Sequence, residues 1–244
     1  MADLPTADVA VRQALMRALD LNQMMAVQTS GIGALADGLA SVQPKVCPGD
    51  TVGDILSQGA DLDAAGQLLD DAGWVMGSSG VREKDGQPLS IRAFYVTEFE
   101  GAADAMELAT AQWNQLGVDV DLQGVDSAQF NTLAFESRAW DVFLAAVNLD
   151  VPSLAVPFLS GPQPPDGINF SAVSNPEYES LVAEASALTG SAACSKWDEA
   201  EKALYAQMNI LPYAVNTLLT FGRNAEFAAG RLGLIPSSIR LFED

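Results

Sequence analysis

The residues with the clearest chemical potential lie where an apolar run ends. Residues 140–147 are almost wholly apolar and predict a strand buried on both faces, and Asn148 and Asp150 follow it. In open α/β sheets, ligands bind in the crevice at the ends of the strands. A carboxylate there can pair with a ligand ammonium, because an ion pair is stronger in a low-dielectric cleft than at the surface. Asp150 could equally cap a helix that begins near Pro152, and the residues alone leave both interpretations open.

Two further candidates follow another predicted strand. Residues 89–96 are rich in β-branched and aromatic side chains, and Thr97 and Glu98 come directly after them. We therefore place Thr97 and Glu98 with Asn148 and Asp150 as candidate ligand-binding residues at strand ends.

Catalysis finds little support in the chain. There is no His, which removes Ser-His-Asp chemistry, Cys-His chemistry and the commonest zinc ligand. The nucleophile elbow, the P-loop and the EF-hand pattern are absent. Acid pairs such as Asp70–Asp71 lie on helix or strand edges that are expected to face water. We therefore expect no enzyme, no metal site and no cofactor, although an enzyme that uses acidic residues remains a weaker alternative.

The charge balance excludes further classes of protein. Lys and Arg number 12 against 32 Asp and Glu, which gives a formal charge of −20. Such a chain cannot neutralise a nucleic acid backbone, and an anionic membrane surface would repel it. Hydrophobic residues reach 49%, too many for a disordered acidic chain. The acidity is interpreted as solubility of a monomer, with a cationic ligand and salt tolerance as open alternatives.

Two cysteines are present, Cys47 and Cys194. They share no short spacing, so neither a redox motif nor a Cys-rich metal site is predicted. An oxidising compartment would permit one disulfide between them, and separate buried thiols are the alternative.

The elements that must position these residues alternate between helix and strand. Asp61 and Asn175 are strong N-cap candidates, and Lys84-Asp85-Gly86 is a turn candidate. Helices are predicted over 8–25, 61–72, 100–116, 126–136, 175–189 and 194–208, and strands over 89–96, 118–122, 140–147 and 210–221. Long loops are expected over 31–54 and 160–170. The alternation predicts an α/β fold with a sheet covered on both faces.

The first twenty residues contain neither a basic segment nor an apolar core typical of a signal peptide. No apolar stretch is long enough to span a membrane. We expect either a cytoplasmic protein or one whose targeting segment has been removed.

Several segments, in order, resemble family 5 extracellular solute-binding proteins, the peptide, nickel and dipeptide receptors of ABC importers. They are residues 11–25, the helix closing at Ala72-Gly73-Trp74, the hairpin 80–91, Leu116-Gly117-Val118, Trp140-Asp141, Asn175-Pro176-Glu177 and Ile210-Leu211-Pro212. The resemblance implies a type II periplasmic-binding-protein-like lobe, with a mixed β-sheet and helices on both faces. Residues 1–244 would be one C-terminal lobe, with about 210–244 returning toward a first lobe that this chain lacks.

The resemblance also implies a function. Two lobes would close on a peptide or similar small solute and deliver it to ABC permease subunits, so the partners would be ligand, permease and first lobe. The protein would be extracellular, as a lipoprotein, or periplasmic. The position that takes a peptide's amino group falls on Asp150 when counted from Asp141, and on Asn148 when counted from Pro152.

An exported parent would meet oxidising conditions, so the resemblance favours a Cys47–Cys194 disulfide. The alternative function is a ligand-sensing domain of a cytoplasmic regulator with the same fold. An oxidised pair would favour export over that alternative.

Overall fold

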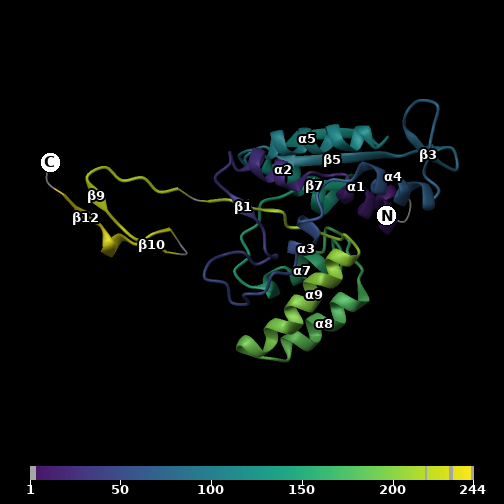
Figure 1. The fold of residues 1–244 in the computed structure, drawn as a ribbon. Coiled ribbons are helices and arrows are strands. Elements are labelled where there is room, and N and C mark those ends of the chain that lie inside the picture. The colour runs from purple at the N-terminus through teal and green to yellow at the C-terminus, as the bar shows by residue number, and fades with distance from the viewer. Residues whose placement is uncertain (1–3, 218, 231–232, 243–244) are drawn as a thin grey trace.

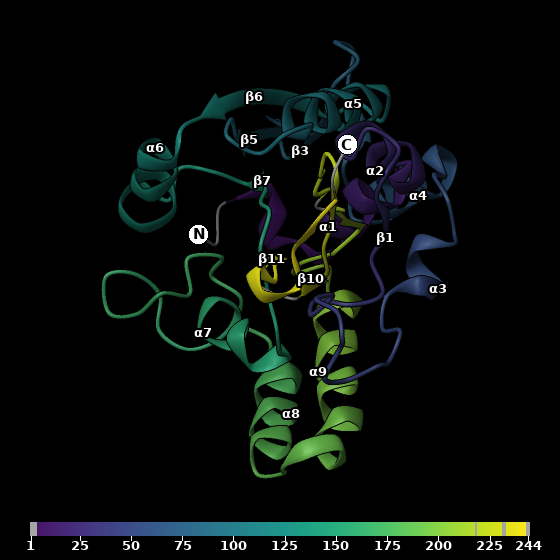
Figure 2. The ribbon, with the colours of Figure 1, turned by 90° about the vertical axis from the view of Figure 1, so that its left-hand side faces the viewer.

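Three parallel strands form the centre of the molecule in the computed structural model, which describes residues 4–217, 219–230 and 233–242. The strands are β5 (Ser90–Val96), β6 (Asp119–Val125) and β7 (Val142–Leu144), in the order β6-β5-β7 (Figure 2). Tyr95 stands in register with Gly124 on one side and Leu144 on the other. All three strands therefore end at one edge, called here the carboxyl edge.

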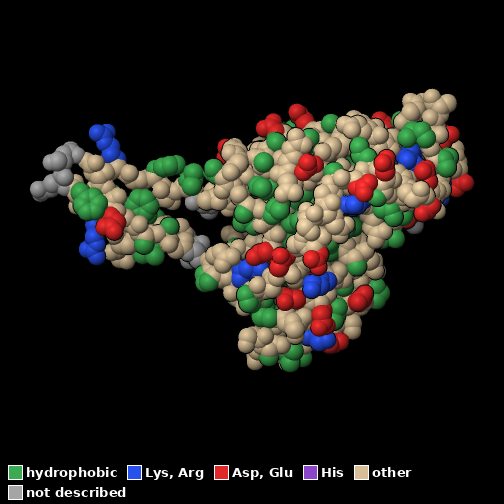
Figure 3. Space-filling view, viewed as in Figure 1, with side chains coloured by type: hydrophobic (Ala, Val, Ile, Leu, Met, Phe, Trp, Pro, Cys, Tyr) green, Lys and Arg blue, Asp and Glu red, His purple; other side chains and the backbone are tan. Residues whose placement is uncertain are grey.

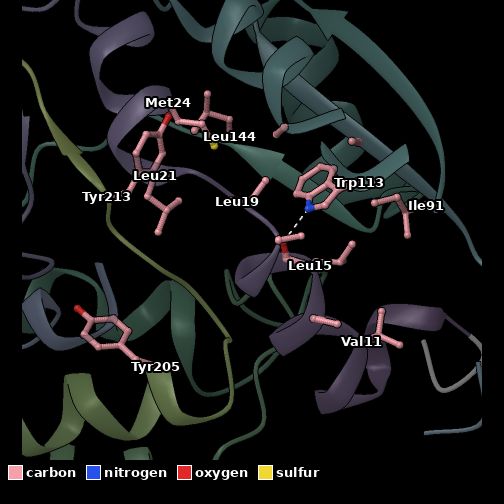
Figure 4. Packing of buried hydrophobic residues seen from close by; sticks show 14 of the residues in the cluster. Val11, Leu15, Leu19, Leu21, Met24, Ile91, Trp113, Leu144, Tyr205 and Tyr213 are labelled. Carbon is pink, nitrogen blue, oxygen red and sulfur yellow. Dashed lines mark hydrogen bonds between the residues drawn. The ribbon is translucent and has the colours of Figure 1, made fainter. Parts of the chain in front are cut away.

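Helices cover one face of this sheet. Ile91 and Ala93 of β5 point to that face and are buried beneath α5 (Ala102–Gln115) and the two N-terminal helices, α1 (Val9–Arg17) and α2 (Leu21–Gln28). Trp113 of α5 donates its indole N–H to the carbonyl of Leu15 at 2.7 Å, which ties α5 to α1 (Figure 4). This hydrogen bond satisfies a polar atom that burial would otherwise leave unpaired.

The opposite face carries aromatic side chains. Phe94 of β5 stacks on Phe143 of β7 and meets Phe130 of α6 (Ser127–Asn131) edge-on. A π-helical turn, Thr132–Ser137, continues α6. The α/β class and the cover on both faces are therefore confirmed, and antiparallel pairing occurs in separate small ladders rather than within this sheet.

The helix predicted over 8–25 is two helices. The first ends at Arg17, and Asp20 caps the second by accepting from the amide of Gln23 at 2.9 Å. The Asp20 amide in turn donates to the side chain of Gln112 on α5. A capping residue inside a continuous apolar pattern thus lets the chain turn, so that α2 packs on α5 while α1 packs on the later helix 62–71.

Capping and turn chemistry set the next elements as predicted. Asp61 caps α4 (Leu62–Asp71), and Asp85 and Gly86, both with positive φ, turn the hairpin that follows. The hairpin strands are β2 (Val75–Met76), β3 (Arg82–Lys84) and β4 (Gln87–Pro88). Buried Arg82 donates to the carbonyls of Trp74 and Leu116. It therefore fastens the hairpin to the ends of α4 and α5.

A helical hairpin forms the lower part of the molecule (Figure 1). Asn175 caps α8 (Pro176–Ser186) and also donates to the carbonyl of Ala203 on α9 (Cys194–Ala206), so one side chain joins the two helices. Short helical turns complete the structure: α3 (Gly53–Leu56), α7 (Val156–Leu159), η1 (Pro5–Ala7), η3 (Pro152–Leu154), η4 (Gly190–Ala193) and η5 (Pro236–Ser238). No helix among the described residues combines the length and apolar content that crossing a bilayer requires.

Two predicted strands are much shorter than expected. The run 140–147 contributes only the three residues of β7, an edge strand, and Val147 beyond it is 64% exposed. The described residues of the run 210–221 contribute one short strand, β8 (Ala214–Val215), which pairs with β1 (Ala34–Leu35). An apolar run predicts burial but not pairing, because pairing also requires a partner strand in register.

Residues 219–230 and 233–242, called here the arm, extend away from the rest of the described chain, called the body (Figure 1). Its strands pair with one another, β9 (Ala225–Glu226) with β12 (Arg240–Leu241) and β10 (Ala229–Gly230) with β11 (Gly233–Leu234). Phe221 is 86% exposed and Leu241 80%. Residues 218, 231–232 and 243–244 of the predicted return segment lie outside the described residues.

The long loop between β1 and α3 is held to α9 in two ways. Buried Glu201 of α9 accepts hydrogen bonds from the amide of Leu39 and from the hydroxyls of Thr51 and Tyr205. Cys47 and Cys194 are joined by a disulfide, with Cα atoms 5.2 Å apart. The disulfide prediction is therefore confirmed, and the separate-thiol alternative is wrong.

Removing this disulfide should destabilise the chain substantially. It closes a sequence separation of 147 residues, for which the chain-entropy model gives a contribution of about 5 kcal/mol. Replacing both cysteines by serine should therefore lower the free energy of unfolding by up to this amount in urea titrations. Dithiothreitol should lower the unfolding midpoint of the parent chain and leave the serine variant unchanged. Equal midpoints for reduced and oxidised parent would contradict the expectation.

Candidate functional site at the carboxyl edge

Thr97 joins the ends of β5 and β6 at the carboxyl edge. Its amide donates to the carbonyl of Val125 at 2.9 Å, and its hydroxyl lies 3.3 Å from both that carbonyl and the carboxylate of Glu98. The structure therefore brings the predicted pair Thr97 and Glu98 together at an exposed strand end.

Glu98 is committed to the start of α6. Its carboxylate accepts from the amide of Ser127 at 3.0 Å, and this hydrogen bond is the main cause that lowers the pKa of Glu98 below its usual value. Asp126 caps the same helix by accepting from the amides of Ala128 and Gln129. Glu98 is thus held ionised at a fixed position, as a negative charge at the sheet edge.

Asn148 and Asp150 lie on the segment that leaves β7 at the same edge. Asn148 is exposed and Asp150 is half-buried. The turn that follows, η3, has Val151 at its N-cap position, and Asp150 comes directly before it. The other carboxylate of this region, Asp141, accepts from the backbone and side chain of Arg92 at the start of β7.

An aromatic cluster holds the segment around β7. The ring centroid of Phe170, in the loop 160–170, lies 5.2–6.5 Å from the centroids of five other aromatic rings. Those rings belong to Phe130, Phe135, Trp140, Phe143 and Phe158. The cluster fixes the course of the chain before it reaches Asn148 and Asp150.

A groove of about 380 Å³ begins directly after Asp150. Residues 151–153 form one wall, the disulfide loop at Val46 and Cys47 forms another, and Trp197 of α9 also lines it. The sequence did not predict this groove, because its walls come from three segments that lie far apart in the chain, residues 46–47, 151–153 and 185–197. A second cavity, bordered by Met16, Leu21 and Leu211, measures about 30 Å³ and has room for little more than water.

The described residues contain no group of three His, Cys, Asp or Glu side chains placed to hold a metal ion. Burial raises the pKa of the phenols of Tyr178, Tyr205 and Tyr213 far above neutrality, and the charge of Glu201 adds to this for the first two. These tyrosines therefore stay protonated and act as hydrogen-bonding or packing groups.

This α/β arrangement is the fold of bacterial solute-binding proteins. The oligopeptide-binding protein AppA from Bacillus subtilis superposes with a TM-score of 0.73 at 23% identity, covering 83% of this chain and 40% of AppA. A substrate binding protein from Microbacterium hydrocarbonoxydans superposes with a TM-score of 0.74 at 20% identity. This superposition covers 99% of the present chain and 48% of the Microbacterium protein. NikA from Brucella suis superposes with a TM-score of 0.64 at 25% identity, and the superposition covers 91% of this chain and 47% of NikA.

The sequence places the chain more narrowly. The family described as "Bacterial extracellular solute-binding proteins, family 5 Middle" matches residues 1–164, and the chain belongs to this family. It is 32% identical over 174 residues to the oligopeptide-binding protein OppA of Lactococcus lactis, which covers 64% of this chain and 28% of OppA. It is 31% identical over 143 residues to the nickel-binding periplasmic protein of Escherichia coli, and this alignment covers 58% of the present chain and 26% of the Escherichia coli protein. The aligned regions thus amount to less than a third of those relatives.

The contact between Glu98 and Ser127 can be tested by removing one amide. Ser127 is the first residue of α6, where proline is tolerated, and Asp126 before it is already extended. Ser127→Pro removes the amide donor, so the pKa of Glu98 should rise toward its ordinary value in a carbon-13 NMR titration of the carboxyl groups. The variant Ser127→Ala, which keeps the amide, should retain most of the lowering. An unchanged Glu98 pKa in Ser127→Pro would show that this contact is absent in solution.

Proposed function

We propose that the chain is the ligand-binding C-terminal lobe of an extracellular receptor that delivers a peptide or similar small solute to an ABC importer. The observation that carries this proposal is the convergence of the three parallel strand ends on one edge. Exposed Thr97 and Glu98 follow β5 there, and the segment that carries Asn148 and Asp150 leaves β7 from the same edge. Relatives named for oligopeptide binding and for nickel binding support a binding role rather than catalysis.

Asp150 would take the amino group of the solute. It is half-buried on the segment that follows β7, and the next residue in the chain, Val151, lines the groove. An ammonium at this position gains from partial exclusion of water, which strengthens its attraction to a carboxylate. Exposed Asn148, two residues earlier, would supply a neutral hydrogen-bonding group, and Glu98 would add to the negative potential of the edge.

A second lobe would complete the site. The arm supports this proposal, because it exposes apolar side chains such as Phe221 and Leu241 and leaves the body altogether (Figure 3). Beyond residue 215, three arginines balance Glu226, Glu243 and Asp244, so the whole charge of −20 resides in residues 1–215. A segment with exposed apolar side chains and so few charges suits burial against another protein surface, and its proposed destination is the first lobe of the same receptor.

Closure of the two lobes would exclude water from the solute, and the closed form would dock on the permease. The disulfide supports a location outside the cytoplasm and counts against the alternative of a cytoplasmic ligand-sensing domain. A lipoprotein anchor or a periplasmic location is part of the same proposal. The chain by itself is expected to be a monomer, because a body with a charge of −20 repels its copies.

The two-lobe mechanism predicts a large difference in affinity. The 244-residue chain should bind the tripeptide Ala-Ala-Ala only weakly, because half of the cleft is absent and closure cannot complete the contacts. A receptor that also contains the first lobe should bind it far more tightly. Isothermal titration calorimetry on both proteins measures the difference, and equal affinities would contradict the mechanism.

The role of Asp150 can be tested in the two-lobe receptor. Asp150→Asn keeps the size of the side chain and removes the charge, so the affinity for Ala-Ala-Ala should fall at least tenfold, about 1.4 kcal/mol. N-acetyl-Ala-Ala-Ala should bind the parent and the variant equally, since it has no ammonium. Asn148→Ala is the matched variant and should have the smaller effect. A larger loss in Asn148→Ala than in Asp150→Asn would move the amino-binding position to Asn148.

A further inference from the structure

The strand β6 lies at the open side of the parallel sheet. It pairs with β5 on one side and has no partner strand on the other among the described residues, and Figure 2 shows it along the outer boundary of the body. With seven residues it is as long as β5, the central strand. An edge of this length presents a row of backbone groups to which another extended chain can bind.

The hydrogen bonds of β6 identify which backbone groups face outward. The amide of Asp119 donates to the carbonyl of Leu89 at 2.9 Å, and at the other end the amide of Thr97 donates to the carbonyl of Val125 at 2.9 Å. The odd-numbered residues therefore bond to β5, and successive residues of a strand direct their backbone groups to opposite sides. The even-numbered residues of 120–124 thus point their N–H and C=O groups away from β5. Within the described chain, none of these groups takes part in a hydrogen bond.

The side chains along this edge differ between the two faces of the sheet. Asp121 stands in register with Arg92, on the face of the aromatic cluster, and Asp119 lies on the same face. Both aspartates are exposed, and no described Lys or Arg forms an ion pair with either carboxylate. On the helix-covered face, Val120 and Leu122 are partly buried against the core. The edge thus alternates two unneutralised negative charges with apolar positions.

These charges disfavour a second copy of the strand as the partner. Parallel pairing of two copies places each carboxylate opposite its own copy, and antiparallel pairing about Val120 places Asp119 opposite Asp121. Like charges directly opposite each other destabilise a strand pair. The formal charge of −20 adds repulsion between whole chains. The same charges attract a strand that carries basic side chains at alternate positions.

We propose that the open edge of β6 binds an extended segment of another protein in which Lys or Arg alternates with apolar residues. Backbone hydrogen bonds to residues 120, 122 and 124 supply the pairing, and basic side chains opposite Asp119 and Asp121 set its register. This partner runs along the side of β6, whereas the solute site is proposed at the strand ends. The inference therefore goes beyond solute binding and does not depend on which solute is bound.

Amide hydrogen exchange, measured by NMR with three capped hexapeptides, tests the proposal. The probes are Lys-Val-Lys-Val-Lys-Val, its rearrangement Lys-Lys-Lys-Val-Val-Val, and Glu-Val-Glu-Val-Glu-Val. The alternating lysine peptide, at about nine times its Kd, should slow exchange of the amides of Val120, Leu122 and Gly124 about tenfold, because only the free chain exchanges. The other two peptides at the same concentration should leave these amides unchanged. Equal protection by the rearranged peptide would indicate general attraction between opposite charges and would overturn the proposal.

Two double variants provide the matched control. Asp119→Asn with Asp121→Asn removes both charges of the edge, and Glu177→Gln with Glu179→Gln removes two exposed charges from the start of α8, away from β6 (Figure 2). The first variant should bind the alternating lysine peptide about tenfold more weakly, because two cross-strand charge pairs are lost. The second should keep the affinity of the parent. Equal losses would show that net charge rather than the edge attracts the peptide, against the proposal.

A proline at an outward position tests the backbone pairing itself. Val120→Pro removes one outward donor, and an edge strand tolerates proline where the N–H faces solvent. Binding of the alternating lysine peptide should weaken, while protected amides of Asp121 and Gln123 report that β6 still pairs with β5. Unchanged binding with those amides protected would overturn the backbone pairing. Protection of the outward amides that grows with chain concentration, without any peptide, would identify a second copy as the occupant and contradict the proposal.

Discussion

The parallel pairing of β5 with both β6 and β7 is the constraint on which the rest of the structure depends. Parallel strands cannot be joined by tight turns, so each connection must cross over the sheet through a helix. The first crossover uses α5 and the second uses α6 with its π-helical turn, which lie on opposite faces of the sheet. The same geometry brings every strand end to one edge, where Thr97 and Glu98 are exposed and where the segment that carries Asn148 and Asp150 leaves β7. The candidate site thus follows from the topology, and the capping of α6 by Glu98 and Asp126 follows from the same crossover.

A second set of interactions shapes the surroundings of that edge. The loop after β1 carries Cys47 and is anchored to α9 by a covalent bond and by the buried carboxylate of Glu201. Burying a carboxylate is costly unless its oxygens accept hydrogen bonds, and Glu201 has three donors. These anchors create a firm wall beside the turn that follows Asp150. The body therefore carries a fixed negative charge at the sheet edge, on Glu98, and an uncharged groove between residues 151–153, the disulfide loop and the helical hairpin.

Local chemistry in the sequence predicted much of this fold. Asp61 and Asn175 cap helices where their types and positions indicated, and Asp85-Gly86 turns the hairpin, because caps and turns depend on a few neighbouring residues. The runs 140–147 and 210–221 yielded only short strands, since pairing depends on partners that sequence patterns do not reveal. Asp20 split a helix whose apolar spacing looked continuous. Thr97 and Glu98 could be placed at a strand end, whereas the groove could not be foreseen, because Val46, residues 151–153, Leu188 and Trp197 converge only in three dimensions.

The claim that solute binds at the carboxyl edge of the sheet is tested most directly by mapping backbone amide shifts of the nitrogen-15-labelled chain during titration with Leu-Leu. The largest shift changes should fall in residues 97–98, 126–127 and 145–153, around the ends of the three strands and the entrance to the groove. The hairpin of β2, β3 and β4, which precedes the opposite end of β5, should remain unchanged (Figure 1). Shift changes concentrated in that hairpin, with none at the three strand ends, would contradict the placement of the binding site.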